Sequence, residues 1–195
     1  MELIRGLHNL HRRHHGCVAT IGNFDGVHRG HQTILRRTCE EARARGLPAT
    51  LMTFEPQPME FFAPQAAPSR LTRLREKLEL LDELGLDRVV LVRFDRHFAA
   101  LPASAFIEDL LVAGLGVEHL VIGDDFRFGA RRQGDFAMLT EAGETLGFTV
   151  EAAPSYELGG ARVSSTRVRQ ALMNGDMDLA EELLGRPYHM SGRGA

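Results

Sequence analysis

The fold is decided by residues 17–31, which read CVATIGNFDGVHRGH. The apolar run Cys17–Ile21 predicts a buried strand, and the glycines that follow it allow a tight turn into a helix. His28 and His31 lie three residues apart, so both imidazoles are expected on one face of the first helical turn. Donors at the positive end of a helix predict a binding site for a triphosphate.

The glycines of this stretch support the same interpretation. Gly22 and Gly26 permit close approach of a ligand to the backbone, and Gly30 leaves a bare surface between the two imidazoles. Core histidines and a partial zinc site are the alternatives. Zinc is disfavoured, because this H-x-x-H lacks the glutamate of H-E-x-x-H and no third ligand is evident.

The chain contains a single lysine, Lys77, among 23 basic residues. A Walker A loop requires Gly-Lys-Ser/Thr, whereas Lys77 follows Glu76 in a helical pattern. This excludes P-loop chemistry and disfavours Schiff-base chemistry. Any phosphate bound here would be held by arginine, histidine and backbone N–H groups.

Strands alternate with helices along the chain, which predicts βαβ units and a parallel sheet. The predicted strands are Cys17–Ile21, Ala49–Phe54, Arg88–Val92, His119–Ile122 and Phe148–Glu151. The predicted helices are 28–45, 71–84, 103–113, 135–146, Ser165–Met173 and Met177–Leu184. Residues 55–69 carry four of the eight prolines, and a loop of this length is usually functional.

A second motif, RVSSTRVR, occupies residues 162–169. Serine and threonine before an apolar periodic run predict a helix N-cap. Free N–H groups, hydroxyls and Arg169 one turn in would bind an anion. Taken alone, the motif is better explained by a plain cap with solvated arginines. Together with the first motif, the anion-binding interpretation is favoured.

Five segments together resemble a known family: GNFDGVHRGHQ, TFEPQP, IGDDFRFGARRQGD, VSSTRVR and LLGRPY. They are similar to the FMN adenylyltransferase (FAD synthetase) module of bifunctional riboflavin kinase/FMN adenylyltransferases, in the nucleotidylyltransferase superfamily. The resemblance implies an α/β, Rossmann-like fold with a five-stranded parallel sheet, flanking helices and a small C-terminal helical subdomain. It places the adenylyltransferase domain at 1–184, and a linker with the start of a truncated riboflavin kinase domain at 185–195.

The resemblance also implies roles for individual residues. The catalytic residues, which would hold the ATP phosphates, are His28, His31, Ser165, Thr166 and Arg169. Residues expected to bind substrate are Gly22, Asn23, Phe24, Asp25, Gly30, Phe54, Phe62, Phe106, Asp125, Phe128 and Ser164. The phenylalanines would surround the flavin ring, with core packing as the alternative. Mg²⁺ is expected to be held mainly by phosphates, with Asp125 as a candidate ligand.

The implied reaction transfers AMP from ATP to FMN and releases pyrophosphate. Another phosphorylated acceptor and a non-catalytic flavin nucleotide sensor are the alternative functions. The formal net charge of −3, without a basic stripe, argues against nucleic acid as a partner. No apolar run reaches membrane-spanning length, and no secretory signal precedes the first strand, so a cytoplasmic location is expected.

Overall fold

The computed structural model describes residues 1–123 and 125–189, and its centre is a six-stranded sheet in which all neighbouring strands are parallel. Five strands match the predicted ones within two residues at each end, which confirms the α/β class. The strands are β1 (Glu2–Arg5), β2 (Cys17–Ile21), β3 (Ala49–Glu55), β4 (Arg88–Arg93), β5 (Val117–Gly123) and β6 (Thr149–Ala153).

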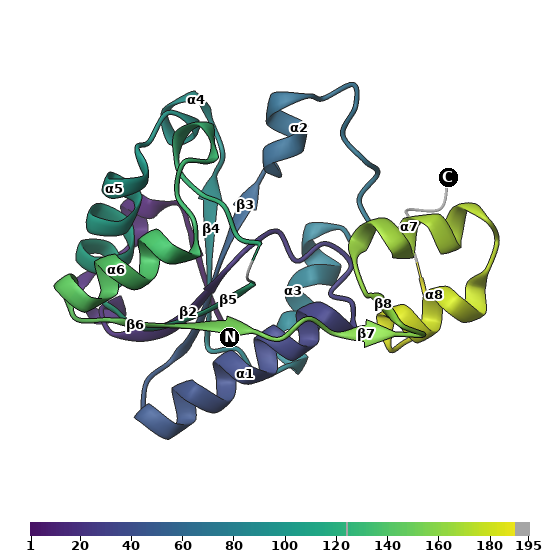
Figure 1. Cartoon of the computed structure of the whole chain (residues 1–195), viewed down its shortest axis with the longest axis horizontal. Helices are drawn as coiled ribbons and strands as arrows, with labels where there is room; N and C mark the ends of the chain where they lie inside the picture. Colours follow the sequence, from purple (N-terminus) through teal and green to yellow (C-terminus); the bar gives the residue numbers. More distant parts are fainter. Residues whose placement is uncertain (124, 190–195) are drawn as a thin grey trace.

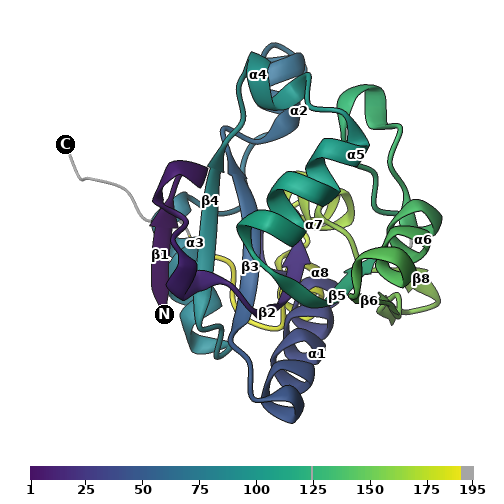
Figure 2. The ribbon, with the colours of Figure 1, turned by 90° about the vertical axis from the view of Figure 1, so that its left-hand side faces the viewer.

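The prediction of five strands was wrong by one, because β1 also joins the sheet. It pairs with β4 at one edge, through Glu2 N–H to Asp87 O (2.7 Å) and Gly6 N–H to Leu91 O (2.8 Å). Figure 2 shows β1 at that edge. A four-residue strand carries too little alternation to be recognised from its own sequence, since its partner lies more than eighty residues away.

The strand order β1-β4-β3-β2-β5-β6 fixes where a ligand can bind. From β2 the chain winds through β3 and β4 to one side, and then through β5 and β6 to the other. In open parallel sheets the crevice at such a switch point, outside the carboxyl ends of the strands, takes the ligand. Here it lies after Ile21 of β2 and Gly123 of β5.

Helices cover both faces of the sheet (Figure 1 and Figure 2). One face packs on α1 (Arg29–Arg45) and α3 (Leu74–Glu83), through a core that includes Leu35, Leu51 and Leu81. The other face packs on a second group of helices, through a core that includes Ile107 and Leu139. This group consists of η1 (Leu7–Asn9), α4 (Arg96–Ala99), α5 (Ala103–Ala105), the π-helical segment η3 (Phe106–Gly114) and α6 (Phe136–Leu146). Two single turns, η2 (Arg12–His14) and η4 (Ala130–Arg132), lie in the connecting segments.

A short helix and a two-stranded hairpin lie where the sequence predicted loops. Helix α2 (Pro58–Phe62) begins at Pro58 inside the proline-rich segment, and its N-terminus is capped by Glu60, which accepts from Gln57 N–H (2.8 Å). Strands β7 (Glu157–Leu158) and β8 (Ala161–Arg162) form a hairpin. Its two turn residues are glycines with positive φ, a signal that the sequence carries openly.

A small helical subdomain is built from α7 (Ser165–Met173) and α8 (Met177–Leu184), which Figure 1 shows to one side of the sheet. Its core contains Val168, Ala180 and Leu183, together with Leu71 from the segment before α3. Both helices match their predicted bounds. Within the described ranges, no helix combines the length and apolar character needed to cross a bilayer.

Candidate active site

The turn between β2 and α1 has a strained backbone. Phe24, Gly26 and Val27 have φ of 49°, 83° and 42°, so three of four consecutive residues lie in the left-handed region. Such a conformation costs about 1–3 kcal/mol at a non-glycine residue, and it is rarest for a β-branched one such as Val27. Strain of this kind persists only where the surroundings hold it, which marks the turn as a functional candidate.

The two predicted phosphate-binding histidines lie together immediately after this turn. The rings of His28 and His31 stack with their centroids 3.6 Å apart. The ring of Phe24 also contacts His31, with centroids 4.8 Å apart. His28 is the N-cap of α1: its Nδ1 accepts from the backbone N–H of His31 (3.3 Å). The proton of a neutral His28 ring is therefore on Nε2, which leaves Nε2–H as its donor to a ligand.

Both imidazoles are neutral at pH 7. Burial lowers the pKa of His28 to about 4, and the charge of Arg162 adds to the shift. Burial also holds the pKa of His31 well below its ordinary value, with smaller contributions from His28 and Lys77. The rings therefore carry directional N–H donors but no charge.

The second motif meets the first at Asp25. The Ser165 hydroxyl donates to the backbone carbonyl of Asp25 (2.9 Å), and the Arg169 guanidinium forms an ion pair with the Asp25 carboxylate. That carboxylate is 3% exposed and also accepts from the N–H groups of Leu71 and Thr72. Its oxygens are thus occupied by donors of the protein itself, so Asp25 joins the two motifs rather than facing a ligand.

The start of α7 is built as predicted. Ser164 is its N-cap and accepts from Arg167 N–H (3.2 Å), while the exposed Thr166 lies in the first turn. Gly30 allows the two motifs to approach: a Cβ there would lie 3.2 Å from both the His28 ring and the Val163 carbonyl. The N-termini of α1 and α7 are therefore neighbours, which concentrates N–H donors at one place.

Asn23 and Asp125 lie on either side of the switch point. The Oδ1 of Asn23 and the Nδ1 of His31 are buried without a hydrogen-bond partner among the described residues, as expected of groups that await a ligand. Asp125 is 67% exposed and pairs with Arg162 (3.2 Å) across the ends of β5 and β8. Its neighbour Asp124 lies outside the described residues.

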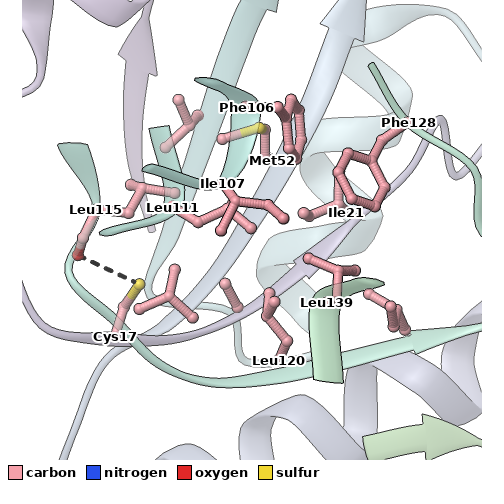
Figure 3. Close-up of a cluster of buried hydrophobic side chains, with 14 of the residues drawn as sticks. Cys17, Ile21, Met52, Phe106, Ile107, Leu111, Leu115, Leu120, Phe128 and Leu139 are labelled. Carbon is pink, nitrogen blue, oxygen red and sulfur yellow. Dashed lines mark hydrogen bonds between the residues drawn. The ribbon is translucent and has the colours of Figure 1, made fainter. Parts of the chain in front are cut away.

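The predicted flavin-contacting phenylalanines divide into buried and exposed ones. Phe106 and Phe128 are 2% and 6% exposed and belong to the apolar core drawn in Figure 3, where Phe128 lies near Ile21. Phe54 is also buried, at 8%. Phe62 on α2 is 64% exposed. The sequence pattern does not distinguish these residues, because strand alternation cannot show whether a phenylalanine faces the core or a ligand.

Ring contacts nevertheless join Phe62 to the core. Phe94, which follows β4, contacts both Phe62 (centroids 5.6 Å) and Phe54 (5.8 Å). Helix α2 is held over the end of β3 by Arg70, whose guanidinium pairs with Glu60 (2.5 Å) and Glu55 (2.7 Å). An aromatic surface therefore extends from the carboxyl ends of β3 and β4 to the exposed ring of Phe62.

Sequence reasoning missed three residues that support the turn. In the sequence Lys77 indicates only that a Walker A loop is absent, yet in the fold its Nζ donates to the Asn23 carbonyl (2.7 Å). Arg186 was placed in a linker, yet its guanidinium donates to the Gly26 carbonyl (2.7 Å). The Thr72 hydroxyl accepts from Gly26 N–H (3.0 Å). No local pattern announces these contacts, because each joins segments 46 to 160 residues apart.

Comparison with solved structures shows the same fold elsewhere. A crystal structure described as a macrolide-efflux protein from Streptococcus pneumoniae matches with a TM-score of 0.81 at 26% identity. The match covers 96% of this chain and 72% of that one.

Comparison with curated proteins gives closer likenesses. Bifunctional riboflavin kinase/FMN adenylyltransferases from Escherichia coli K12, Pseudomonas fluorescens and Haemophilus influenzae are 58%, 56% and 52% identical over 99% of this chain. The chain spans 62–63% of the length of these relatives. The FAD synthetase family matches residues 10–167, which include both motifs of the site up to Arg167. The chain therefore belongs to the FAD synthetase family.

Proposed function

We propose that this chain transfers the AMP moiety of ATP to the phosphate of FMN, giving FAD and pyrophosphate. The observation that carries the proposal is the junction of the two motifs. Ser165 and Arg169 at the start of α7 are fastened to Asp25, beside the two neutral imidazoles at the start of α1. This brings two helix N-termini and two N–H donors to the switch point, as binding of a triphosphate requires.

The chemistry needs little from the protein besides alignment and charge stabilisation. The phosphate of FMN has a second pKa near 6, so at neutral pH it is largely a dianion and already nucleophilic. One of its oxygens attacks the α-phosphorus of ATP, and the bond from that phosphorus to the bridging oxygen of the β-phosphate breaks. Pyrophosphate leaves with the bonding electrons. No general base and no covalent protein intermediate are required.

The residues divide these tasks. His28 and His31 would donate N–H groups to the β- and γ-phosphates and stabilise the charge that grows on pyrophosphate. The α7 N-terminus, with Ser164, Ser165 and Thr166, would hold the same phosphates from the other side. Arg169 would act through its ion pair with Asp25, which keeps α7 against the turn.

Magnesium enters this proposal as part of the substrate MgATP. Among the described residues no group of three or more histidine, cysteine, aspartate or glutamate side chains could hold a metal ion. Phosphate oxygens and water are the ligands that Mg²⁺ prefers in such sites, and Asp125 is the carboxylate that we assign beside them.

The aromatic surface suits a large planar acceptor. Phe62 presents an exposed ring that is continuous with Phe94, at the carboxyl ends of β3 and β4. We assign to Phe62 a stacking contact with the flavin ring. Phe54, Phe106 and Phe128 would form the wall behind it, because they are buried.

Two statements about the wider protein belong to the same proposal. The longer relatives carry a riboflavin kinase name, so a protein that continues beyond this chain would also make FMN, the acceptor used here. Cys17 and Cys39 are both buried and unpaired, which suits a reducing compartment such as the cytoplasm.

The test is direct. The protein is incubated with FMN and MgATP, and the flavins are separated by chromatography. Formation of FAD with an equal amount of pyrophosphate is the expected result. Binding of FMN without FAD formation would instead support a flavin nucleotide sensor. Consumption of ATP only when another phosphorylated acceptor is supplied would support a different nucleotidylyltransferase.

A further inference from the structure

The strained turn is held from outside at four carbonyls. Lys77 Nζ donates to Asn23 O (2.7 Å), and Ser165 Oγ donates to Asp25 O (2.9 Å). Arg186 donates to both Gly26 O (2.7 Å) and Val27 O (3.2 Å). These side chains come from α3, α7 and the segment after α8.

Two of these donors are cations that have no carboxylate within ion-pair distance among the described residues. Lys77 is 2% exposed, and within residues 1–123 and 125–189 neither it nor Arg186 forms an ion pair. Burial lowers the pKa of both side chains. The carboxylates of Asp25, Glu55 and Glu60 attract Lys77 from longer range, and Glu83 attracts Arg186. A cation that is removed from water without a direct ion pair needs compensating hydrogen bonds. Among the described residues, both side chains donate to main-chain oxygens: those of the turn and, for Arg186, also Leu184 O.

We propose that Lys77 and Arg186 are positioning residues that hold residues 23–27 in the conformation that binds the ATP phosphates; this rests on the function proposed above. A peptide unit is planar, so its carbonyl and the next N–H point in opposite directions. Lys77 fixes the Asn23 carbonyl, while Arg186 fixes the Val27 carbonyl together with Gln32 Nε2 (2.9 Å). The N–H groups of Phe24 and His28 then point away from these donors. In the described part of the chain those two N–H groups make no hydrogen bond.

Arg186 extends the catalytic unit beyond the predicted boundary at 184. The segment 185–195 was expected to be a linker, and residues 190–195 lie outside the described residues. Arg186 nevertheless contacts the turn, and Tyr188 packs against the α7–α8 core. Displacement of this segment would therefore remove the hydrogen bonds of Arg186 to the turn at the phosphate site.

The experiment compares Lys77→Met and Arg186→Met with Arg75→Met in the otherwise intact chain. Arg75 lies on the same helix as Lys77 and is 90% exposed, so its loss should change nothing. Each of the first two variants should lower kcat/KM for MgATP about 10- to 100-fold, the size of one lost charged hydrogen bond. Affinity for FMN should stay within about twofold of the wild type. Arg186→Lys, which keeps one donor, should recover part of the loss.

Amide hydrogen exchange of residues 22–28 provides a readout that is independent of turnover. It should be faster in Lys77→Met and Arg186→Met, and unchanged in Arg75→Met. Unchanged exchange and unchanged kcat/KM in both variants would overturn the proposal, as would equal losses for MgATP and FMN. If Lys77→Met does not fold, Arg186→Met decides by the same two readouts, with Arg186→Lys as its partial rescue. Absence of FAD formation in the wild type would refute the proposed function, while exchange and ATP calorimetry would still judge the positioning role.

Discussion

The two halves of the site are built by different means. The phosphate half, formed by residues 22–28 with the starts of α1 and α7, is fastened by hydrogen bonds from distant segments and contains a buried ion pair. The aromatic half, formed by Phe54, Phe62, Phe94, Phe98, Phe106 and Phe128, is held by ring contacts. The phosphate half is therefore fixed by directional polar contacts between distant segments, whereas the aromatic half is fixed by apolar packing.

Asp25→Asn should give the largest effect in the phosphate half. It removes the charge that balances Arg169 while keeping the shape of the side chain. Arg169 is partly buried, so leaving it unpaired should lower the unfolding free energy by up to about 3–5 kcal/mol, which urea denaturation would measure. Glu79→Gln breaks the exposed pair with Arg75 and should cost less than about 1 kcal/mol. If the two substitutions lowered the unfolding free energy equally, the ion pair between Asp25 and Arg169 would have no special structural role.

Phe128→Ala tests the aromatic half by its stability. Phe128 is 6% exposed and contacts Phe106 and Phe126, so its truncation should cost about 3–5 kcal/mol in thermal or urea unfolding. FMN affinity should change little if the ring only supports the wall. A fully stable variant with weakened FMN binding would make Phe128 a flavin contact, as the sequence suggested.

His31→Ala should lower kcat about 10²–10³-fold, the usual loss for one transition-state donor. His28→Asn sharpens the test, because asparagine can still cap α1 while the N–H donor of the ring is lost. Steady-state kinetics with both substrates measures the effect, and His11→Ala, at an exposed site, is the control. Full turnover in either variant would remove that histidine from the mechanism.

The buried histidines should also make stability depend on pH. His28 has a folded pKa of about 4, below its unfolded value of about 6.5, so above pH 6.5 the ring is neutral in both states and contributes no pH dependence. As the pH falls from 6.5 to 4, the ring takes up a proton in the unfolded state but not in the folded state. The free energy of unfolding therefore decreases by up to about 3 kcal/mol. His28→Asn should show a shallower decline over this window. An unchanged slope would mean that the ring is protonated in the folded protein.

Phe62→Ala should give the smallest effect, confined to the acceptor. The ring is 64% exposed, so stability should hardly change, while FMN binding should weaken by about 1–3 kcal/mol, by analogy with base stacking on aromatic side chains. Calorimetry should show unchanged ATP affinity. Met59, which is 50% exposed on the same helix, gives the control variant Met59→Ala.

The fold could be predicted where the pattern is local. Periodicity located Cys17–Ile21, and caps located Ser165–Met173 and Met177–Leu184, because each signal lies within the element itself. The edge strand Glu2–Arg5 was missed since only its pairing with β4 defines it.

The site, like the fold, was predictable where its signals are local in the sequence. The histidines and the N-cap serine follow from spacing, and their residue types carry the chemistry. The ion pair between Asp25 and Arg169 could not be predicted from local spacing, because 144 residues separate the two. Phe62 and Phe106 looked equivalent in the sequence, and only the packing shows that one is exposed and the other buried.

Because Lys77 is buried, its chemical labelling can report local opening of the protein. Lys77 carries the only side-chain amine of the chain, and in the folded state it is 2% exposed against the Asn23 carbonyl. An amine-reactive reagent can modify it only while α3 and the turn are apart, so the modification rate measures how often that opening occurs. Ligands that close the phosphate half should slow this labelling without any probe being introduced.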